Sequence, residues 1–274
     1  ALPISSCWMV LEPRVRRGYK IFVQILNVLK MRFLVFSLAL LSLTGCVKNK
    51  SKHELGKPWT VLEGDYNKGV EKRYSPQSIL MVETPYLNSK PHGLKKEYYS
   101  DGNLHRITPI ENGYVNGIIK EYYKSGSLYK ESPVAKGKTD GVVKKYHTNG
   151  VLMSEAIYKR GRPQMGLKEY DETGKLKEAP EITITGKNNI QRNGTYLIEL
   201  SVPSVSSRIK YYLITNFEGK EKAVPIPTEL GKGVYSIAIP KGTNVSKELL
   251  FEYKFVTLYG NTCILRKTYK LKVP

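Results

Sequence analysis

A period of 24 residues in the middle of the chain is the feature that most restricts its fold. Tyrosine, glycine and leucine each recur at this interval and in the same phase: Tyr98, Tyr122, Tyr146 and Tyr170; Gly102, Gly126, Gly150 and Gly174; Leu104, Leu128, Leu152 and Leu176. Gly93, Gly117 and Gly141 open the first three units, and Gly113, Gly137 and Gly161 mark a second turn. Extending the period backwards predicts a degenerate capping unit over residues 69–92.

Each unit has the features of a β-hairpin. Tyr98 runs into Ser100-Asp101-Gly102, and a glycine at the end of such a triplet suits a three-residue loop with positive φ. Tyr98 is then expected to face Leu104 across the hairpin, with both side chains on one face. Two glycine-marked turns per unit leave no room for a long amphipathic helix. We therefore predict an all-β fold with an antiparallel β-meander over residues 69–178.

The pattern Gly93-x4-Tyr98-Tyr99-x2-Gly102-x-Leu104, with its copies, resembles the variant MORN repeat of bacterial proteins. This resemblance covers about residues 69–178. It implies a role in membrane association or protein scaffolding, and similar bacterial proteins are often described as antitoxin components of toxin–antitoxin systems. The resemblance assigns no catalytic residue.

A lysine precedes each repeat tyrosine by two positions, and residues two apart on a strand share a face. The candidate ligand-binding stripe consists of Lys72, Lys96, Lys120, Lys144 and Lys168 with Tyr98, Tyr122 and Tyr146. In one interpretation the stripe binds an anionic polymer or lipid headgroups. In the other, which we favour, each lysine lays its aliphatic stem over the neighbouring tyrosine and stabilises a thin sheet.

A second domain follows, because the period stops after Pro180 and short β-rich segments take over. The predicted strands are Glu181–Thr185, Thr195–Val202, Arg208–Thr215, Val234–Ile239, Leu249–Tyr259 and Thr262–Val273. Phe251, Tyr253 and Phe255 alternate and should share one face. An immunoglobulin-like β-sandwich over residues 180–274 is the expected architecture.

The N-terminal part has the layout of a lipoprotein signal. Residues 1–30 are expected to be a mis-called or added extension, and residues 31–45 a signal peptide with a short positive start and an apolar core. Leu43-Thr44-Gly45-Cys46 resembles the lipobox of bacterial lipoproteins, which implies that Cys46 carries acyl chains and anchors the protein to a membrane. Residues 46–68 would then be the lipidated cysteine and a tether, with Trp59 capping the first repeat.

The charge of the chain restricts its partners. Removal of residues 1–45 would take away six Lys/Arg and one Glu and lower the net charge from +20 to +15. For an exported protein we expect no nucleic acid partner, and either a solvated surface or an anionic envelope polymer, lipid or acidic protein. Cys263 would be the one cysteine left besides Cys46, and we expect it to be a small buried hydrophobe.

No catalytic or metal-binding constellation is evident, so we expect a protein that is not an enzyme and has no cofactor. His53, His92, His105 and His147 lack metal-ligand spacing. Glu97, Glu121 and Glu169 recur on the face opposite the lysines and are expected to be solvated. His147 stands in the column of Tyr99 and Tyr123, which favours a repeat position over a catalytic one.

The leading hypothesis is a lipid-anchored bacterial envelope protein that binds partners or organises other components. We expect it on the outer membrane, and both the periplasmic side and the outer surface are compatible with the sequence. One alternative is an immunity or antitoxin-like protein that neutralises a toxin. The other is a glycan-binding accessory protein in which Tyr211, Tyr212 and Tyr259 would contact sugar. For these three tyrosines we favour a place in the hydrophobic core.

Overall fold

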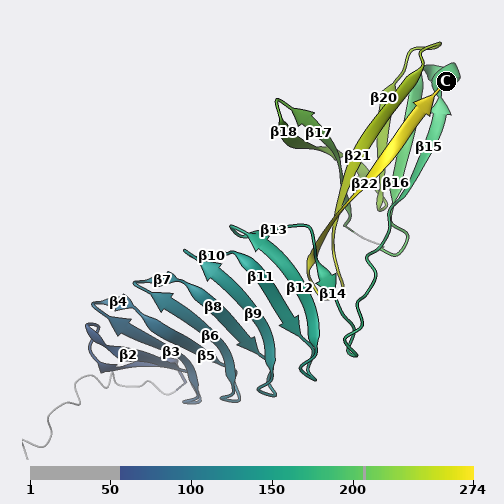
Figure 1. Ribbon diagram of the computed structural model, residues 1–274. Coiled ribbons are helices and arrows are strands. Elements are labelled where there is room, and N and C mark those ends of the chain that lie inside the picture. The colour runs from purple at the N-terminus through teal and green to yellow at the C-terminus, as the bar shows by residue number, and fades with distance from the viewer. Residues whose placement is uncertain (1–55, 206–207) are drawn as a thin grey trace, which may run out of the picture. The chain divides into compact units, whose positions relative to one another are not determined.

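A computed structural model describes residues 56–205 and 208–274, which lie within a single compact unit, His53–Pro274 (Figure 1). The expected extension over residues 1–30, the signal peptide over residues 31–45 and the lipidated Cys46 lie outside the described residues. The described part of the chain forms one long antiparallel sheet followed by two smaller sheets.

The repeat region forms a 14-stranded antiparallel sheet. Its strands are β1 (Trp59–Gly64), β2 (Lys68–Tyr74), β3 (Leu80–Leu87), β4 (Lys90–Pro91), β5 (Gly93–Tyr98), β6 (Leu104–Glu111), β7 (Tyr114–Val115), β8 (Gly117–Tyr122), β9 (Leu128–Ala135), β10 (Lys138–Thr139), β11 (Gly141–Tyr146), β12 (Leu152–Lys159), β13 (Arg162–Pro163) and β14 (Lys168–Glu169). The long strands pair in chain order from β1 to β12, which confirms the predicted meander.

The hairpin loops close as their chemistry predicts. The Tyr99 N–H donates to Asn103 O at 2.8 Å, and the Gly102 N–H donates to Tyr99 O at 2.9 Å, which leaves a three-residue loop. Gly102 has φ +86°, and Tyr98 lies opposite Leu104 as predicted. A register shift between Glu97 and Tyr98 adds a bulge beside the loop.

The glycine that opens each unit is needed for two reasons: its φ is positive, and a proline of the preceding unit leaves little space for a Cβ atom. Gly117 has φ +117°, and a Cβ atom there would lie 3.0 Å from Pro109 Cγ on the preceding long strand. Gly93 and Gly141 meet Pro85 and Pro133 in the same way. Successive units therefore approach closely at a glycine–proline contact that recurs along the sheet.

Residues after Pro180 form two four-stranded sheets. The elements are β15 (Thr183–Asn189), α2 (Ile190–Asn193), β16 (Thr195–Ser201), β17 (Lys210–Phe217), β18 (Lys220–Ile226), β19 (Thr228–Glu229), β20 (Lys232–Ala238), β21 (Val245–Val256) and β22 (Thr262–Val273). One sheet has the order β15-β16-β20-β19 and the other β18-β17-β21-β22. These are the orders ABED and GFC of an immunoglobulin-like sandwich, with one additional edge strand, β18.

The sandwich encloses a continuous apolar core. Ile198, Leu200, Tyr211 and Phe251 are almost fully buried, and Tyr253, Phe255 and Cys263 belong to the same cluster. Phe251, Tyr253 and Phe255 alternate along β21 and all three are buried, as their spacing predicts.

Several details differ from the sequence-based expectation. Trp59–Gly64 is not tether but strand β1, because it pairs along its whole length with β2, and Trp59 stacks on Tyr74 at 4.2 Å between ring centroids. Strand β18 was not predicted, because it is polar and contains Pro225, which only an edge strand tolerates. Helix α2 was also missed, since its four residues are too few to show helical periodicity.

Candidate functional site

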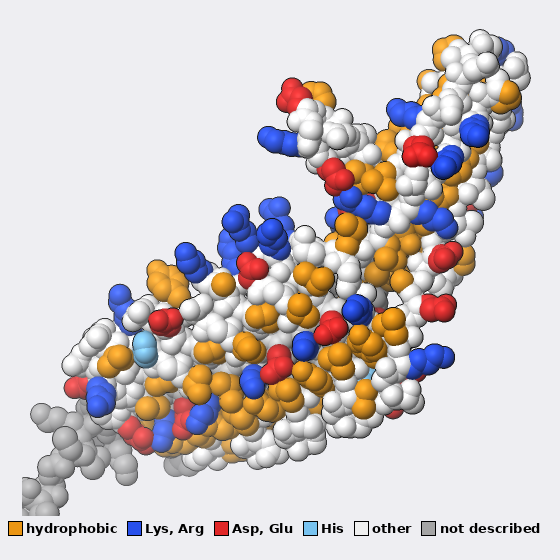
Figure 2. Space-filling view, in the orientation of Figure 1, with side chains coloured by type: hydrophobic (Ala, Val, Ile, Leu, Met, Phe, Trp, Pro, Cys, Tyr) orange, Lys and Arg blue, Asp and Glu red, His pale blue; other side chains and the backbone are white. Residues whose placement is uncertain are grey.

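Every lysine of the predicted stripe lies in one straight row across the repeat sheet. The strand registers connect, in order, Lys72, Glu83, Lys96, Ile107, Lys120, Glu131, Lys144, Glu155 and Lys168, which we call the charged row. Figure 2 shows a line of alternating blue and red side chains over the repeat strands, with hydrophobic side chains on both sides of it.

Glutamates between the lysines change what this row offers to a ligand. Lys120 Nζ lies 3.4 Å from Glu131, and Lys96 Nζ lies 3.7 Å from Glu83. Five lysines and three glutamates leave the charged row with a net charge of only +2. The surface is therefore a chain of cross-strand ion pairs rather than a purely cationic groove.

The stripe tyrosines lie on the same face and share these glutamates. The Tyr98 hydroxyl donates to Glu83 at 2.8 Å, and the Tyr146 hydroxyl donates to Glu131 at 3.0 Å. Burial, and then the hydrogen bond that the hydroxyl donates to the Glu83 carboxylate, raise the pKa of Tyr98 to about 12. Tyr122 has Ile107 at the corresponding place. The structure thus brings the predicted lysines and tyrosines together, through acidic residues that the sequence analysis did not include.

An apolar row of exposed and half-buried residues borders the charged row on the side away from the stripe tyrosines. Its members lie two residues along each strand from the charged row and are Val70, Pro85, Leu94, Pro109, Ile118, Pro133, Val142 and Ile157. Leu94, Ile118 and Val142 are 55%, 51% and 42% exposed. Large apolar side chains that are exposed side by side are typical of a surface that binds a partner.

The opposite face links successive units through the second aromatic residue of each repeat. The Tyr99 hydroxyl donates to Tyr122 O at 2.6 Å, and the Tyr123 hydroxyl donates to Tyr146 O at 2.7 Å. His147 Nε2 lies 3.0 Å from Tyr170 O, so this histidine takes the place of the tyrosine hydroxyl. This column has a structural role in holding neighbouring units together.

The last units contact the loop between β21 and β22. Lys145 Nζ donates to Tyr259 O at 2.7 Å, and the His147 ring meets the Tyr259 ring edge-on at 5.6 Å. Glu169 Oε1 accepts hydrogen bonds from Thr257 Oγ1 and Asn261 Nδ2, each at 2.6 Å. We call this set of contacts the junction.

One departure from the repeat pattern that the sequence analysis did not consider, at Lys145, lies in the junction. Lys145 stands in the column of Glu97 and Glu121, and burial lowers the pKa of its ammonium group. Glu97 and Glu121 pair with nearby cations, at 2.8 Å from Lys95 and 3.3 Å from Lys130. The expectation that Glu169 is solvated is wrong, because its carboxylate is half-buried and binds Thr257 and Asn261 in the loop between β21 and β22.

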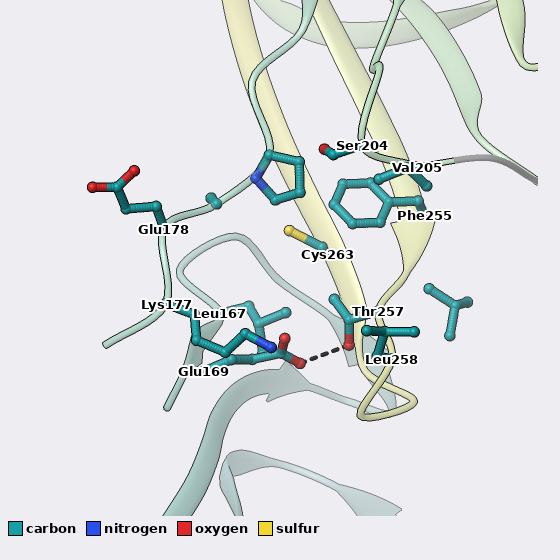
Figure 3. Close-up of a pocket in the computed structure, with 13 residues that line it drawn as sticks. Leu167, Glu169, Lys177, Glu178, Ser204, Val205, Phe255, Thr257, Leu258 and Cys263 are labelled. Atoms are coloured by element: carbon teal, nitrogen blue, oxygen red, sulfur yellow. Dashed lines mark hydrogen bonds between the residues drawn. The ribbon is translucent and has the colours of Figure 1, made fainter. Parts of the chain in front are cut away.

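A cavity of about 300 Å³ lies beside the junction. Figure 3 shows Glu169 and Thr257 on one side of the cavity and Phe255, Cys263 and Val205 on the other. Burial raises the pKa of the Cys263 thiol to about 11, which keeps it protonated at neutral pH. The cavity thus combines apolar walls with one fixed carboxylate.

The aromatic candidates for glycan binding occupy other places. Tyr211 is buried in the sandwich core, and its hydroxyl donates to Gly231 O at 2.9 Å. Tyr259 lies in the junction, where Lys177 Nζ is 4.5 Å from its ring centroid. Tyr212 is half-buried with Lys254 over its ring.

Within residues 56–205 and 208–274, no three His, Cys, Asp or Glu side chains are grouped so that they could hold a metal ion. In the same part of the chain no helix has the length and apolarity needed to cross a membrane.

Three segments of the repeat region match a known family of repeats. A comparison with curated proteins finds no match. Residues 91–112, 115–135 and 139–160 each match the family described as MORN repeat variant. These segments correspond to three of the units predicted from the 24-residue period. The sheet that carries the charged and apolar rows is therefore built, over these segments, from units similar to MORN repeat variants.

Proposed function

We propose that the protein is a non-enzymatic binding or scaffold module whose repeat sheet binds a protein partner through the face that carries the apolar row. The exposure of Leu94, Ile118 and Val142 in one line is the observation that carries this proposal. A partner that covers the row would bury apolar surface at about 25 cal/mol per Å². The adjacent ion pairs would form a polar rim.

A protein partner fits this face better than an anionic polymer does. A polyanion gains affinity from uncompensated cations, whereas every lysine of the charged row lies opposite at least one glutamate. The combined substitution of Lys96, Lys120 and Lys144 by Gln should therefore change binding to anionic liposomes or acidic glycans by less than about threefold. A large loss of binding would favour the polymer instead.

Substitutions in the apolar row test the proposal directly. The Leu94→Thr, Ile118→Thr, Val142→Thr variant keeps side chains that favour strands but removes most of the exposed apolar surface. We expect it to fold and to lose the proteins that cross-link to the native chain in isolated cell envelopes. Val224→Thr, Val234→Thr, Val256→Thr removes exposed valines from the sandwich and serves as the control. An unchanged set of cross-linked proteins in the first variant would contradict the proposal.

We further propose that the module is anchored to a bacterial membrane, on the outer membrane of the envelope, by acyl chains on Cys46. The support is the sequence alone: an apolar stretch that ends in Leu43-Thr44-Gly45-Cys46. Cys46→Ser should release the protein from the membrane fraction and abolish labelling with palmitate. A Cys46→Ser protein that still incorporates palmitate would contradict the anchor while leaving the binding face untouched.

A further inference from the structure

The cavity beside the junction has the composition of a small-molecule site. Its walls include Leu167, Pro180, Val205, Phe255 and Cys263. Phe255 and Cys263 belong to the sandwich core, and Leu167 and Val205 pack against it. A volume of about 300 Å³ lies at the lower end of the range of ligand sites. It is about twice that of an engineered cavity of roughly 150 Å³ that admits benzene. The space suits a molecule of two fused rings.

Lys177, Glu178, Ser204 and Thr257 line the cavity along with Glu169, and Glu169 is the carboxylate whose position the protein fixes. Thr257 and Asn261 both donate to Oε1 of Glu169 at 2.6 Å and hold the carboxylate in place. Among the described residues, none donates a hydrogen bond to Glu169 Oε2, and Glu169 lines the cavity (Figure 3). An ionised carboxylate only accepts hydrogen bonds, so the ligand group that binds Glu169 must be a hydrogen-bond donor.

Nearby cations decide between neutral and charged donors. Lys177 lines the cavity and lies over the Tyr259 ring, and Lys145 binds the carbonyl oxygen of Tyr259 in the loop that carries Thr257 and Asn261. The Lys145 ammonium group interacts electrostatically with the Glu169 carboxylate, and the positive charge of Lys177 offsets the negative charge of Glu178, which also lines the cavity. A hydroxyl group can therefore use the fixed acceptor without the desolvation cost that an ammonium group would carry.

We propose that this cavity binds a small, mostly apolar, uncharged molecule that donates one hydrogen bond, such as a hydroxyl group on a bicyclic body, to Glu169. The site is separate from the apolar row, so it does not depend on the proposed binding of a protein partner. It makes the junction a place where a ligand touches both the last repeat units and the sandwich.

Three probes of equal shape test the polarity of the site: 1-naphthylmethanol, 1-naphthylmethylamine and 1-naphthoate. Binding to the full chain is followed by chemical-shift changes in proton–nitrogen NMR spectra. We expect saturable shifts centred on Phe255, Thr257 and Cys263 with the alcohol. The amine should bind more weakly, and 1-naphthoate at least about tenfold more weakly than the alcohol. Equal affinities for all three probes, or shifts that spread over the surface, would overturn the proposal.

Glu169→Gln separates recognition from folding. The amide oxygen can still accept from Thr257 and Asn261, but an amide donor replaces Oε2. We expect the alcohol to bind about tenfold more weakly, the effect of about 1.4 kcal/mol, with an unchanged melting temperature. Glu229→Gln, a carboxylate on β19, is the matched control and should bind like the native chain. Undiminished binding of the alcohol by the Glu169→Gln variant would overturn the assignment of Glu169.

A second variant fills the site without removing the carboxylate. Ala179 lines the cavity on the segment that leads from the repeats to the sandwich. Ala179→Phe should occupy the cavity and abolish the NMR shifts for all three probes, while the variant remains folded. Shifts at the same residues in the Ala179→Phe protein would place the probes elsewhere and contradict the proposal.

Discussion

The repeat sheet and the sandwich are both antiparallel β-structures, but they are held together differently. In the sandwich, large side chains such as Phe251 are completely buried between two layers. In the repeat sheet many of the buried side chains are small, among them Ser132, Ser154 and Ala156, and the larger Leu94 is mostly exposed. The repeat sheet depends on contacts between neighbouring units, whereas the sandwich depends on a shared core.

Truncation of the sandwich core should have the largest effect. Phe251→Ala would leave a cavity and lower the free energy of unfolding of the sandwich by about 3–5 kcal/mol. Trp59 reports on the sheet alone in a chain that also carries Trp8→Phe, since the sequence has two tryptophans. Urea unfolding of the Phe251→Ala variant should then show a first circular dichroism transition, from the sandwich, at a lower urea concentration than the Trp59 fluorescence transition of the sheet. A common midpoint would mean that the junction makes the two regions one cooperative unit.

A methyl group at a unit boundary should have the next largest effect. Gly117→Ala places a Cβ atom 3.0 Å from Pro109 Cγ at φ +117°, so we expect a loss of about 1–3 kcal/mol in the Trp59-detected transition. Gly126→Ala is the control for positive φ alone, because nothing lies within 4 Å of its added Cβ. Equal losses for both substitutions would contradict a role for the glycine–proline contact.

The repeat period predicted the sheet well because its evidence is local and repeated. Tyr98, Gly102 and Leu104 specify one hairpin, and each copy of the pattern supports the same interpretation. The charged row was only half predicted, because Glu83, Glu131 and Glu155 come from the other strand of each hairpin and Ile107 interrupts their column. The junction could not be predicted, since Lys145 and Tyr259 are 114 residues apart.

Loss of one bond between units should have a smaller effect. Tyr123→Phe removes the hydrogen bond to Tyr146 O and should lower the stability of the sheet by about 0.5–1.5 kcal/mol. Tyr122→Phe is the matched control on the opposite face. Ile107 stands there in place of a glutamate, so the Tyr122 hydroxyl lacks the hydrogen bond that Tyr98 and Tyr146 donate to a glutamate. Equal stabilities of the two variants in urea would contradict the assignment of Tyr123 to contacts between units.

The ion pairs of the charged row should contribute least. Lys120 and Glu131 are partly exposed, and Lys120 Nζ lies 3.4 Å from the Glu131 carboxylate. Lys120→Gln should therefore lower the free energy of unfolding by only about 0.2–1 kcal/mol at low salt. The difference from the native chain should shrink in 1 M sodium chloride, where the screening length is about 3 Å. A difference that persists at high salt would indicate packing of the lysine stem as the main contribution.

Cross-linking across a unit boundary tests most directly whether the repeats form one sheet in a single register. Ile107 and Lys120 are partners on β6 and β8, which belong to different units, whereas Ile119 points to the other face. With the native cysteines replaced by serine, Ile107→Cys with Lys120→Cys should form a disulfide under mild oxidation, and Ile107→Cys with Ile119→Cys should not. Equal cross-linking of both pairs, or cross-linking of the second pair only, would contradict the register on which the charged and apolar rows depend.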